Sequence, residues 1–381
     1  MKILYGVQGT GNGHITRARH MAKGFAQRKD IQVDYFFSGR KPDQYFDMQE
    51  FGSYSHGRGF TFVTQNGRIR HRKTVLNNNL CHFLRELKSQ NLSGYDLVIN
   101  DFEPITAWAA KRAGIPSISL SHQAAFLHQV PVHQQTIIDK AITKYFAPTQ
   151  YSLGTHWYHF GYDIIPPFVA SELRSIPQKS PSLHEHKLHG HKLNGHKLSG
   201  DNILVYLPFE NLSLIQEHLH VLSDYNFTCY HPLINHDRQD KNIQWKRPAS
   251  APFKTDLIGC DGVISNCGFE LSTECLSLGK PLLVKPLNRQ YEQLSNAYTL
   301  KNLGLCHVLH TINVDEIDDW LQNKQGIQIE YPSDCSDFID WIADGNWTSP
   351  ETICERLWKK VKFPVSVNER LYQLSTQTKR F

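Results

Sequence analysis

The residues with the clearest chemical potential lie near the start of the chain, in the stretch GTGNGH. Gly9, Gly11 and Gly13 follow an apolar segment and precede a helical pattern beginning at Ile15, so the backbone can turn tightly and bring helix amides close to a ligand. His14 stands at the start of that helix, where the positive dipole end favours the neutral imidazole that accepts a proton from a hydroxyl. Two interpretations stay open, a general base or a histidine that only hydrogen-bonds the loop.

Two common nucleotide-binding loops do not fit this stretch. A dinucleotide fingerprint, G-x-G-x-x-G, needs glycine at position 14 and an acidic residue at the end of the second strand, but position 14 is His14 and IQVDYFFSG ends in Ser38 and Gly39. A Walker loop needs Gly-Lys-Ser/Thr after the glycines, and none follows. The stretch therefore argues against a nicotinamide-dependent dehydrogenase and a P-loop NTPase.

A second informative stretch, SNCGFELSTE, lies in the other half of the chain. A strand pattern ends at Asn266, Gly268 permits close backbone approach, and a helix beginning near Phe269 can point its amides at a diphosphate. Glu270 and Glu274 lie one helical turn apart on one face, so one of them could accept hydrogen bonds from ribose hydroxyls. The alternative is an acidic pair that stabilises the helix dipole.

Two further strand patterns end in polar residues. Asp101, in NDFEP, lies at the edge where parallel sheets bind ligands, and it is either a base, an orienter of His14, or the N-cap of a helix beginning at Pro104. His122 and Gln123 follow the next strand pattern, and they either line a cleft or are satisfied loop residues.

Basic residues cluster between the first helical pattern, which begins at Ile15, and the second, which begins near Asn77. Such a cluster is usually a solvated loop, but it could receive an anionic acceptor or the headgroups of a membrane surface. The members are Arg68, Arg70, His71, Arg72 and Lys73.

Composition restricts the class of protein. With 381 residues, 40% hydrophobic and 20% charged, the chain is long enough for two globular domains and too apolar for a disordered protein. The net charge of +5 is small and dispersed, which argues against a nucleic-acid binder. The eight cysteines contain no CxxC pair, which favours reduced thiols over disulfides or a zinc site. We expect a cytoplasmic protein, because neither a signal peptide nor a membrane span is visible.

Strand and helix patterns alternate through residues 1–170 and again through 201–348. This alternation predicts an α/β protein of two Rossmann-like, doubly wound parallel-sheet domains that face each other across a cleft. Residues 171–200 contain HKLHG, HKLNG and HKLSG, a polar repeat that is typical of a length-tolerant linker rather than of a metal site. Residues 349–381 are predicted to form helices that pack back on the first domain.

Several ordered motifs together resemble a known family. SNCGFELSTE, GKPLLVKPL and RQYEQLSNAYTLKNLG resemble the donor-binding half of GT-B nucleotide-sugar glycosyltransferases, the group that includes the peptidoglycan N-acetylglucosaminyltransferase. GTGNGHI resembles the amino-terminal glycine loop of that enzyme. YDLVINDFEPITAWAAKRAGIPSISLSHQ and NILVYLPFEN resemble a bacterial and archaeal branch of the same fold, of the family 1 type. The likeness covers most of the chain outside the linker and tail.

The resemblance implies roles for individual residues of the second domain. Glu274 matches a ribose-binding glutamate, and Gly268 with Phe269 match a diphosphate-facing turn. Gln293 matches a residue that contacts donor-sugar hydroxyls, and Asn296 completes that motif.

Two more positions complete the comparison. Glu292 stands where the peptidoglycan enzyme has another glutamine, so the sugar preference of that enzyme need not transfer. His14 faces the reaction centre from the acceptor domain, with Asp101 as the competing base or as its orienter.

The resemblance implies a hexosyltransferase-like enzyme that moves a sugar from a nucleotide-sugar, a UDP-sugar by family, to an acceptor hydroxyl with anomeric inversion. The chain has no Asp-x-Asp triplet, so neither a metal nor another cofactor is expected beyond the nucleotide-sugar substrate. The acceptor could be lipid-linked, a glycan such as one of the cell envelope, or a small molecule, with peripheral contact at the inner face of the membrane. Two alternatives stay open: a nucleotide-sugar epimerase of the same fold and a non-catalytic nucleotide-sugar-binding protein.

Overall fold

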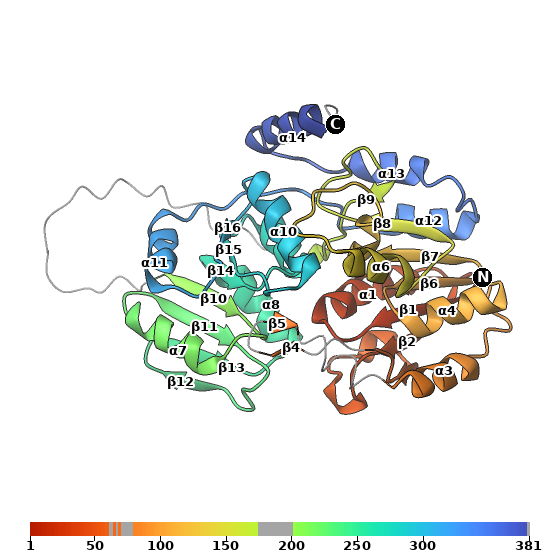
Figure 1. Ribbon diagram of the computed structural model, residues 1–381, viewed down its shortest axis with the longest axis horizontal. Coiled ribbons are helices and arrows are strands. Elements are labelled where there is room, and N and C mark those ends of the chain that lie inside the picture. Colours follow the sequence, from red (N-terminus) through yellow and green to blue (C-terminus); the bar gives the residue numbers. More distant parts are fainter. Residues whose placement is uncertain (61–63, 66–67, 70–78, 174–200, 379–381) are drawn as a thin grey trace, which may run out of the picture.

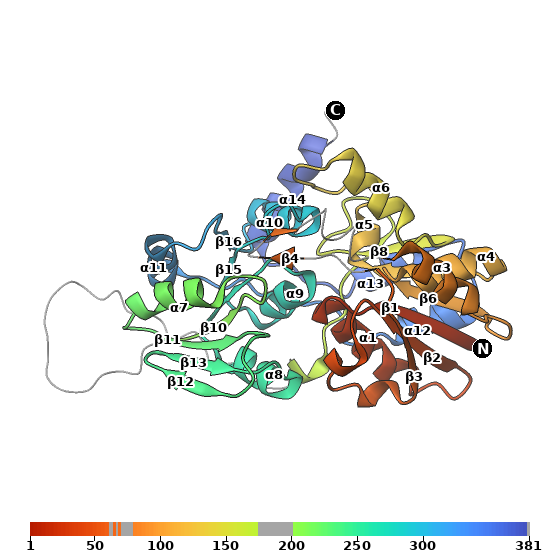
Figure 2. The ribbon, with the colours of Figure 1, turned by 60° about the horizontal axis from the view of Figure 1, so that its bottom comes forward.

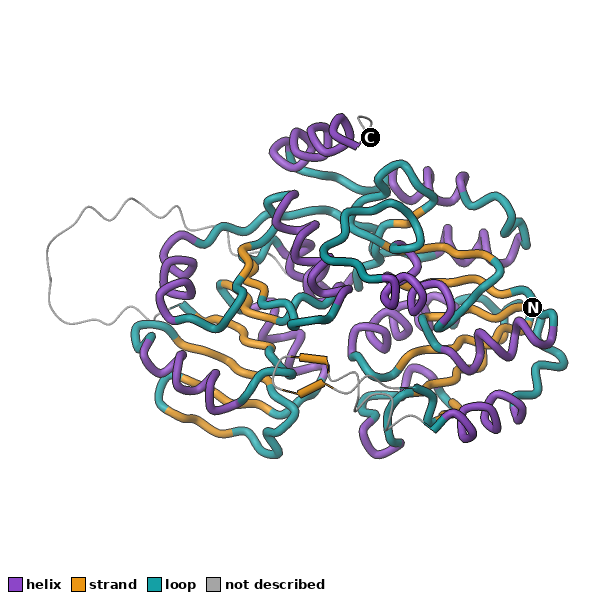
Figure 3. Tube along the Cα trace, viewed as in Figure 1, coloured by secondary structure: helices purple, strands orange, loops and turns teal. Residues whose placement is uncertain are grey.

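The computed structural model describes residues 1–60, 64–65, 68–69, 79–173 and 201–378. Two α/β units lie side by side, each built on a seven-stranded sheet of the described residues (Figure 1). In each unit the strands run through the middle and helices flank them (Figure 3). The predicted α/β class with two doubly wound sheets is confirmed. We call residues 1–173 the N-terminal unit, and residues 201–332 the C-terminal unit.

Some predicted features lie outside the described residues. They include the HKLxG repeat and Arg70, His71, Arg72 and Lys73 of the basic cluster. Arg68 belongs to β5 (Arg68–Ile69), which pairs antiparallel with β4 (Thr64–Gln65).

The sheet of the N-terminal unit has the strand order β3-β2-β1-β6-β7-β8-β9. The chain moves outward from β1 through β2 to β3 and then resumes on the other side of β1 with β6, so a topological switch point lies between β1 and β6. Ligands bind at the carboxyl ends of strands at such points. The strands are β1 (Lys2–Gln8), β2 (Gln32–Ser38), β3 (Tyr54–Gly57), β6 (Leu97–Asp101), β7 (Ser117–Ser121), β8 (Tyr151–Thr155) and β9 (Ile164–Ile165).

Helices cover both faces of this sheet, which explains why β6 and β7 are buried at every position and read as continuous rather than alternating apolar runs. The helices are α1 (Asn12–Phe25), α3 (Leu80–Ser89), α4 (Pro104–Ala113), α5 (His122–Ala125) and α6 (Ile137–Tyr145), with 3₁₀ turns η1 (Pro42–Gln44), η2 (Gln49–Phe51) and η3 (Ser171–Leu173).

The sheet of the C-terminal unit repeats this plan, with the order β12-β13-β11-β10-β14-β15-β16 and a switch point between β10 and β14. Strand β12 pairs antiparallel with β13, whereas the inner strands pair in parallel. The strands are β10 (Asn202–Tyr206), β11 (Asn226–Tyr230), β12 (Arg238–Asp240), β13 (Ile243–Lys246), β14 (Gly262–Ser265), β15 (Leu282–Val284) and β16 (His307–Val308). The helices are α7 (Leu212–Val221), α8 (Ser250–Gly259), α9 (Phe269–Leu278), α10 (Tyr291–Asn302) and α11 (Val314–Asn323).

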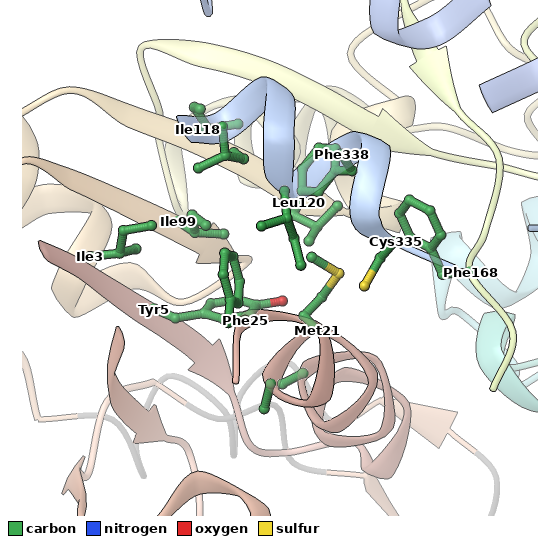
Figure 4. Close-up of a cluster of buried hydrophobic side chains, with 14 of the residues drawn as sticks. Ile3, Tyr5, Met21, Phe25, Ile99, Ile118, Leu120, Phe168, Cys335 and Phe338 are labelled. Carbon is green, nitrogen blue, oxygen red and sulfur yellow. The ribbon is translucent and has the colours of Figure 1, made fainter. Parts of the chain in front are cut away.

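The carboxyl-terminal helices α12 (Ser336–Asp344), α13 (Glu351–Trp358) and α14 (Val365–Thr378) divide between the two units. Phe338 of α12 and Leu357 of α13 belong to the core of the N-terminal unit, where Phe338 and Cys335 lie close to Met21 of α1 (Figure 4).

This packing differs from the sequence prediction in two ways. The chain returns to the N-terminal unit by residue 335, earlier than the predicted position 349, because the apolar face of α12 fits against α1. Val367 and Leu371 of α14 instead join the core of the C-terminal unit. None of the helices in the described part of the chain has the length and apolar character needed to cross a bilayer.

Candidate active site

His14 and Asp101 meet at the switch point of the first sheet. Val7, near the end of β1, pairs with Asp101 at the end of β6, and α1 begins just after β1. His14 therefore reaches Asp101, with Nδ1 2.7 Å from Oδ1. Because the carboxylate accepts a hydrogen bond from Nδ1–H, the lone pair of the neutral imidazole lies on Nε2. The His14 side chain is 14% exposed and that of Asp101 is fully buried, so His14 is the member that a substrate can reach.

A buried arginine of α1, three positions after His14, completes this pair. Arg17 is 7% exposed and donates from Nε to Asp101 Oδ2 at 2.8 Å and from Nη2 to Oδ1 at 2.9 Å. Burial acts to raise the pKa of Asp101, but Arg17 and His14 outweigh it and hold that pKa below its usual value. Asp101 is therefore an anion at neutral pH and can stabilise an imidazolium at His14.

Helix α4 is capped by Glu103 rather than by Asp101, which corrects one of the three roles considered for Asp101. The Glu103 carboxylate accepts from the amides of Ile105 at 2.9 Å and Thr106 at 2.6 Å. Phe102, between the two acids, has a φ of 55°, in the left-handed region. Such a conformation costs on the order of 1 kcal/mol for a non-glycine residue and is enriched at functional sites. The cap and the turn together leave Asp101 free for His14.

The amino ends of α1 and α9 face each other between the two units. Arg17 Nη1 donates to the carboxylate of Glu270, in the first turn of α9. A Cβ atom on Gly13 would lie 3.0 Å from Cγ of Glu270, so a larger residue there would push the Glu270 side chain away. Asn12 Nδ2 also donates to the Tyr206 hydroxyl at 3.1 Å, across the same gap. The glycine stretch that suggested a ligand loop is thus also the contact between the units.

The other two glycines of this stretch have different surroundings. A Cβ atom on Gly9 would lie 2.4 Å from the Tyr45 hydroxyl, so Gly9 is required for packing within the N-terminal unit. Gly11 is the N-cap residue of α1, which begins at Asn12 rather than at the predicted Ile15. The sequence pattern missed this first turn because glycine and asparagine contribute nothing to an apolar period.

A cavity of about 160 Å³ opens beside this contact. Both units line it, with apolar and aromatic surface and a few charged groups, which is the usual lining of a small-molecule site. Burial raises the pKa of Glu274 to about 7, and the nearby charge of Glu270 acts in the same direction. The lining residues include Gly13, Thr16, Arg17 and His20 of α1, Tyr206, Tyr230, Pro248 and Phe253 of the C-terminal unit, and Glu270, Thr273 and Glu274 of α9.

The amino end of α9 is open. Gly268 is its N-cap and supplies no side-chain acceptor, and among the described residues no atom lies within 4 Å of the position that a Cβ there would take. The amides of the first turn are therefore free to bind an anionic group.

Three predicted donor-binding residues of the C-terminal unit are engaged in protein contacts outside the cavity. Gln293 accepts from the amide of Leu287 at 3.0 Å. Asn266 donates to the carbonyl of Lys285 at 2.8 Å and so joins two loops of its own unit. Asn296 donates to the carbonyl of Cys267 at 3.0 Å.

His122 and Gln123 form a second contact between the units. His122 lies 2.7 Å from Asn296 through Nε2, and its ring stacks on Phe269 with centroids 4.0 Å apart. Gln123 donates to Glu292 at 2.9 Å. The structure thus brings these predicted residues together, but as a buried junction beside α9 rather than as the lining of the cavity.

Sequence reasoning missed Arg17, Glu103 and the aromatic lining from Tyr206 and Phe253. Arg17 had one available signal, because it lies three positions after His14 and must share a helix face with it. The aromatic residues had none, since they belong to separate elements, β10 and α8, that meet only in the folded chain.

The two facing doubly wound sheets define a GT-B architecture, with the candidate site between them. The chain belongs to glycosyl transferase family 1, whose family model matches residues 1–324. The protein is therefore a glycosyltransferase.

Solved structures support the same fold at low sequence identity. The spinosyn rhamnosyltransferase SpnG is 12% identical with a TM-score of 0.53, and the match covers 97% of this chain and 98% of that one. The same enzyme complexed with thymidine diphosphate is 11% identical with a TM-score of 0.51 and equal coverage. The glycotransferase of kitacinnamycin is 14% identical with a TM-score of 0.52, covering 84% of this chain and 90% of that one. A search of curated protein sequences finds no match.

Proposed function

We propose that this enzyme transfers a sugar from a nucleoside diphosphate sugar to an acceptor hydroxyl, with inversion at the anomeric carbon and without a metal ion. One observation carries the proposal: the start of α1, which holds His14 beside Asp101, meets the start of α9, which has no side-chain cap, and residues of both helices line one cavity between the units. The complex of SpnG with thymidine diphosphate supports a nucleoside diphosphate as the ligand class. Resemblance favours uridine as the base.

In the proposed reaction, His14, Asp101 and the amides at the start of α9 each have one role. The acceptor oxygen attacks the anomeric carbon as its proton passes to Nε2 of His14, and the bond from that carbon to the phosphate oxygen breaks with its electron pair going to the diphosphate. Asp101 stabilises the imidazolium through Nδ1–H, 2.7 Å away. The amides at the amino end of α9 stabilise the charge that develops on the leaving diphosphate. Attack from the face opposite the leaving group inverts the anomeric centre.

The nucleoside is proposed to occupy the cavity. Glu274 lines it and is placed to accept hydrogen bonds from ribose hydroxyls. Phe253, with Tyr206 and Tyr230, offers an aromatic surface for a base.

Replacing Glu274 by alanine is expected to weaken nucleotide binding by tenfold to about a hundredfold, because a hydrogen bond to a charged group is worth roughly 1.5–3 kcal/mol. Thermal shift and calorimetric titration with UDP-, GDP- and dTDP-sugars measure this change. Glu217→Ala, at an exposed position of α7, is the control and should bind as the wild type does. Unchanged affinity of Glu274→Ala would remove the ribose role.

The same panel distinguishes the alternative activities. A transferase releases free nucleotide only when an acceptor is added. An epimerase would isomerise the sugar nucleotide without an acceptor, and a binding protein would leave it intact.

Peripheral membrane contact is proposed for helix α6. This helix has no buried residue, and Ile137 and Ile138 are 87% and 67% exposed. Tyr145 is also exposed, with Nζ of Lys144 5.4 Å from its ring centroid. Exposed isoleucines with adjacent lysines and tyrosine are typical of a surface that enters the interface of an anionic membrane.

The segment before α6 contacts the C-terminal unit, so this surface lies at the boundary between the two units. That segment crosses to α10, where Gln135 donates to the Tyr291 hydroxyl at 2.7 Å and the amide of His133 donates to Ser295 at 3.1 Å. The helix itself lies on the outside of the molecule (Figure 2). We therefore infer that the acceptor is presented at a lipid surface.

Sedimentation with phosphatidylcholine vesicles containing phosphatidylglycerol tests this inference. Ile137→Asp with Ile138→Asp is expected to reduce the bound fraction at least tenfold, because burial of one isoleucine contributes about 1.5–3 kcal/mol. The control is Val221→Asp, at a 66% exposed position of α7, which should sediment like the wild type. A wild-type protein that stays in the supernatant, or a double variant that sediments equally, would contradict it.

A further inference from the structure

Glu270 lies in the region that the proposed donor diphosphate requires. It is in the first turn of α9, beside the open amides at Gly268, and its side chain packs over Gly13 at the amino end of α1. Two helix amino ends therefore converge on one carboxylate. Its hydrogen-bond partner is Arg17 Nη1 from the opposite unit.

We infer that Glu270 is a displaceable counter-anion. In the empty enzyme it binds Arg17 beside the cavity, and the diphosphate of the incoming donor replaces it as the partner of Arg17. This inference rests on the proposed function and deepens it, because it makes Glu270 a determinant that opposes donor binding. From the sequence, Glu270 was expected either to bind ribose hydroxyls or to stabilise the dipole of its helix.

The geometry of Arg17 allows such an exchange. Its Nε and Nη2 atoms are held by Asp101 at 2.8 and 2.9 Å, so the guanidinium keeps its position when Glu270 leaves. Nη1, which binds Glu270, is the part that faces the second unit. Guanidinium groups bind carboxylates and phosphates with the same planar fork. A diphosphate can therefore replace Glu270 without disturbing the His14–Asp101 pair.

The charges around Glu270 favour its displacement by a diphosphate. The groups around Glu270 are His14 and Arg17 of α1, Tyr5 of β1, Asp101 of β6, Glu274 of α9, and Lys254 of α8, which lines the same cavity. A diphosphate brings further negative charge beside the carboxylates, and like charges at this distance in a buried site repel strongly. Glu270 must then turn away or take up a proton.

Glu270 can take up a proton near neutral pH. Burial raises the pKa of Glu270 to about 7, with Arg17 and His14 opposing and Asp101 adding to the rise. Below that pH the carboxyl is neutral and offers little repulsion to a donor, whereas above it the carboxylate competes for Arg17. Donor affinity should therefore fall as the pH rises above about 7, by about tenfold for each pH unit if binding requires the neutral form.

The test compares Glu270→Gln with Glu274→Gln, two acids one turn apart that line one cavity. UDP-glucose, dTDP-glucose and GDP-glucose are titrated calorimetrically at pH 6 and pH 8, since their diphosphate diesters do not change charge in this range. Glu270→Gln should bind the preferred donor about tenfold more tightly than the wild type at pH 8 and equally at pH 6. Glu274→Gln should bind more weakly at both pH values.

Two further variants distinguish displacement of Glu270 from a structural role. In the Glu270→Gln background, Arg17→Gln should abolish the gain at pH 8, because the cation that receives the diphosphate is gone. Glu270→Ala, which removes the side chain altogether, should show the same gain as Glu270→Gln.

The outcomes distinguish the inference from the function on which it rests. If Glu274→Gln weakens binding but neither Glu270 variant tightens it at pH 8, Glu270 merely stabilises the dipole of α9 and the inference is wrong, while the proposed function stands. If no sugar nucleotide binds the wild type or any variant, the proposed function fails and the inference fails with it.

Discussion

Replacing His14 by alanine is expected to lower the rate of sugar transfer about 10²- to 10⁴-fold, the usual contribution of a positioned general base. Nε2 of His14 is the atom proposed to take the acceptor proton, whereas Asp101, with its fully buried side chain, cannot reach the acceptor. Nucleotide affinity should change little, because His14 is not needed to hold the nucleoside. Initial rates at saturating donor and titration with the free nucleotide measure the two quantities separately.

The matched control is His218→Ala, a partly exposed histidine of α7 whose loss should leave the transfer rate unchanged. Wild-type turnover in the His14→Ala enzyme would end the case for a histidine base. Loss of nucleotide affinity in parallel with the rate would show instead that His14 binds the donor.

Asparagine in place of Asp101 is expected to reduce transfer by a similar factor, about 10²- to 10⁴-fold, for a different reason. An amide carries no charge with which to stabilise the imidazolium, and its NH₂ group must face a donor, either Nδ1–H of His14 or the Arg17 guanidinium. Arg17 would also lose the partner that it contacts through two nitrogen atoms. We expect a stability loss of about 3–5 kcal/mol, the usual cost of breaking a buried ion pair.

Rates and melting temperatures must be measured together for this variant. Glu103→Gln is the appropriate comparison, since it changes a buried carboxylate two positions away that caps α4. It should cost about 1 kcal/mol of stability and leave turnover of the folded enzyme near the wild-type value. If Asp101→Asn were equally active once folded, Asp101 would have only a structural role.

The fold was predictable from local patterns. Alternating apolar strands and helical periods, with glycine and proline at the element ends, indicated two doubly wound sheets, and both are present. Helices were predicted for residues 349–381, where α13 and α14 lie, but α12 was counted with the second domain, and α14 was expected on the first domain although it packs on the second. Packing partners far apart in the chain leave no local pattern.

The candidate site was predictable only in part. A histidine after a glycine loop and an acid at the end of a parallel strand were visible, and the switch point between β1 and β6 explains why they meet. The residues at the start of α10 were assigned to the donor sugar by resemblance, and that role stays a prediction. In the structure Glu292 and Asn296 instead contact Gln123 and His122 across the unit boundary.

The sequence by itself determined which segments become strands and helices and which residues stand at their ends, because turn chemistry and periodicity act over a few neighbouring residues. Only the tertiary structure decided which of these residues contact one another. Arg17 joins Asp101, 84 positions away, and Glu270, 253 positions away. Those contacts depend on the order of the strands and on how the two sheets face each other, which are properties of the whole chain. The charges that set the pKa of Glu270, and the cavity beside it, exist only once both units are in place.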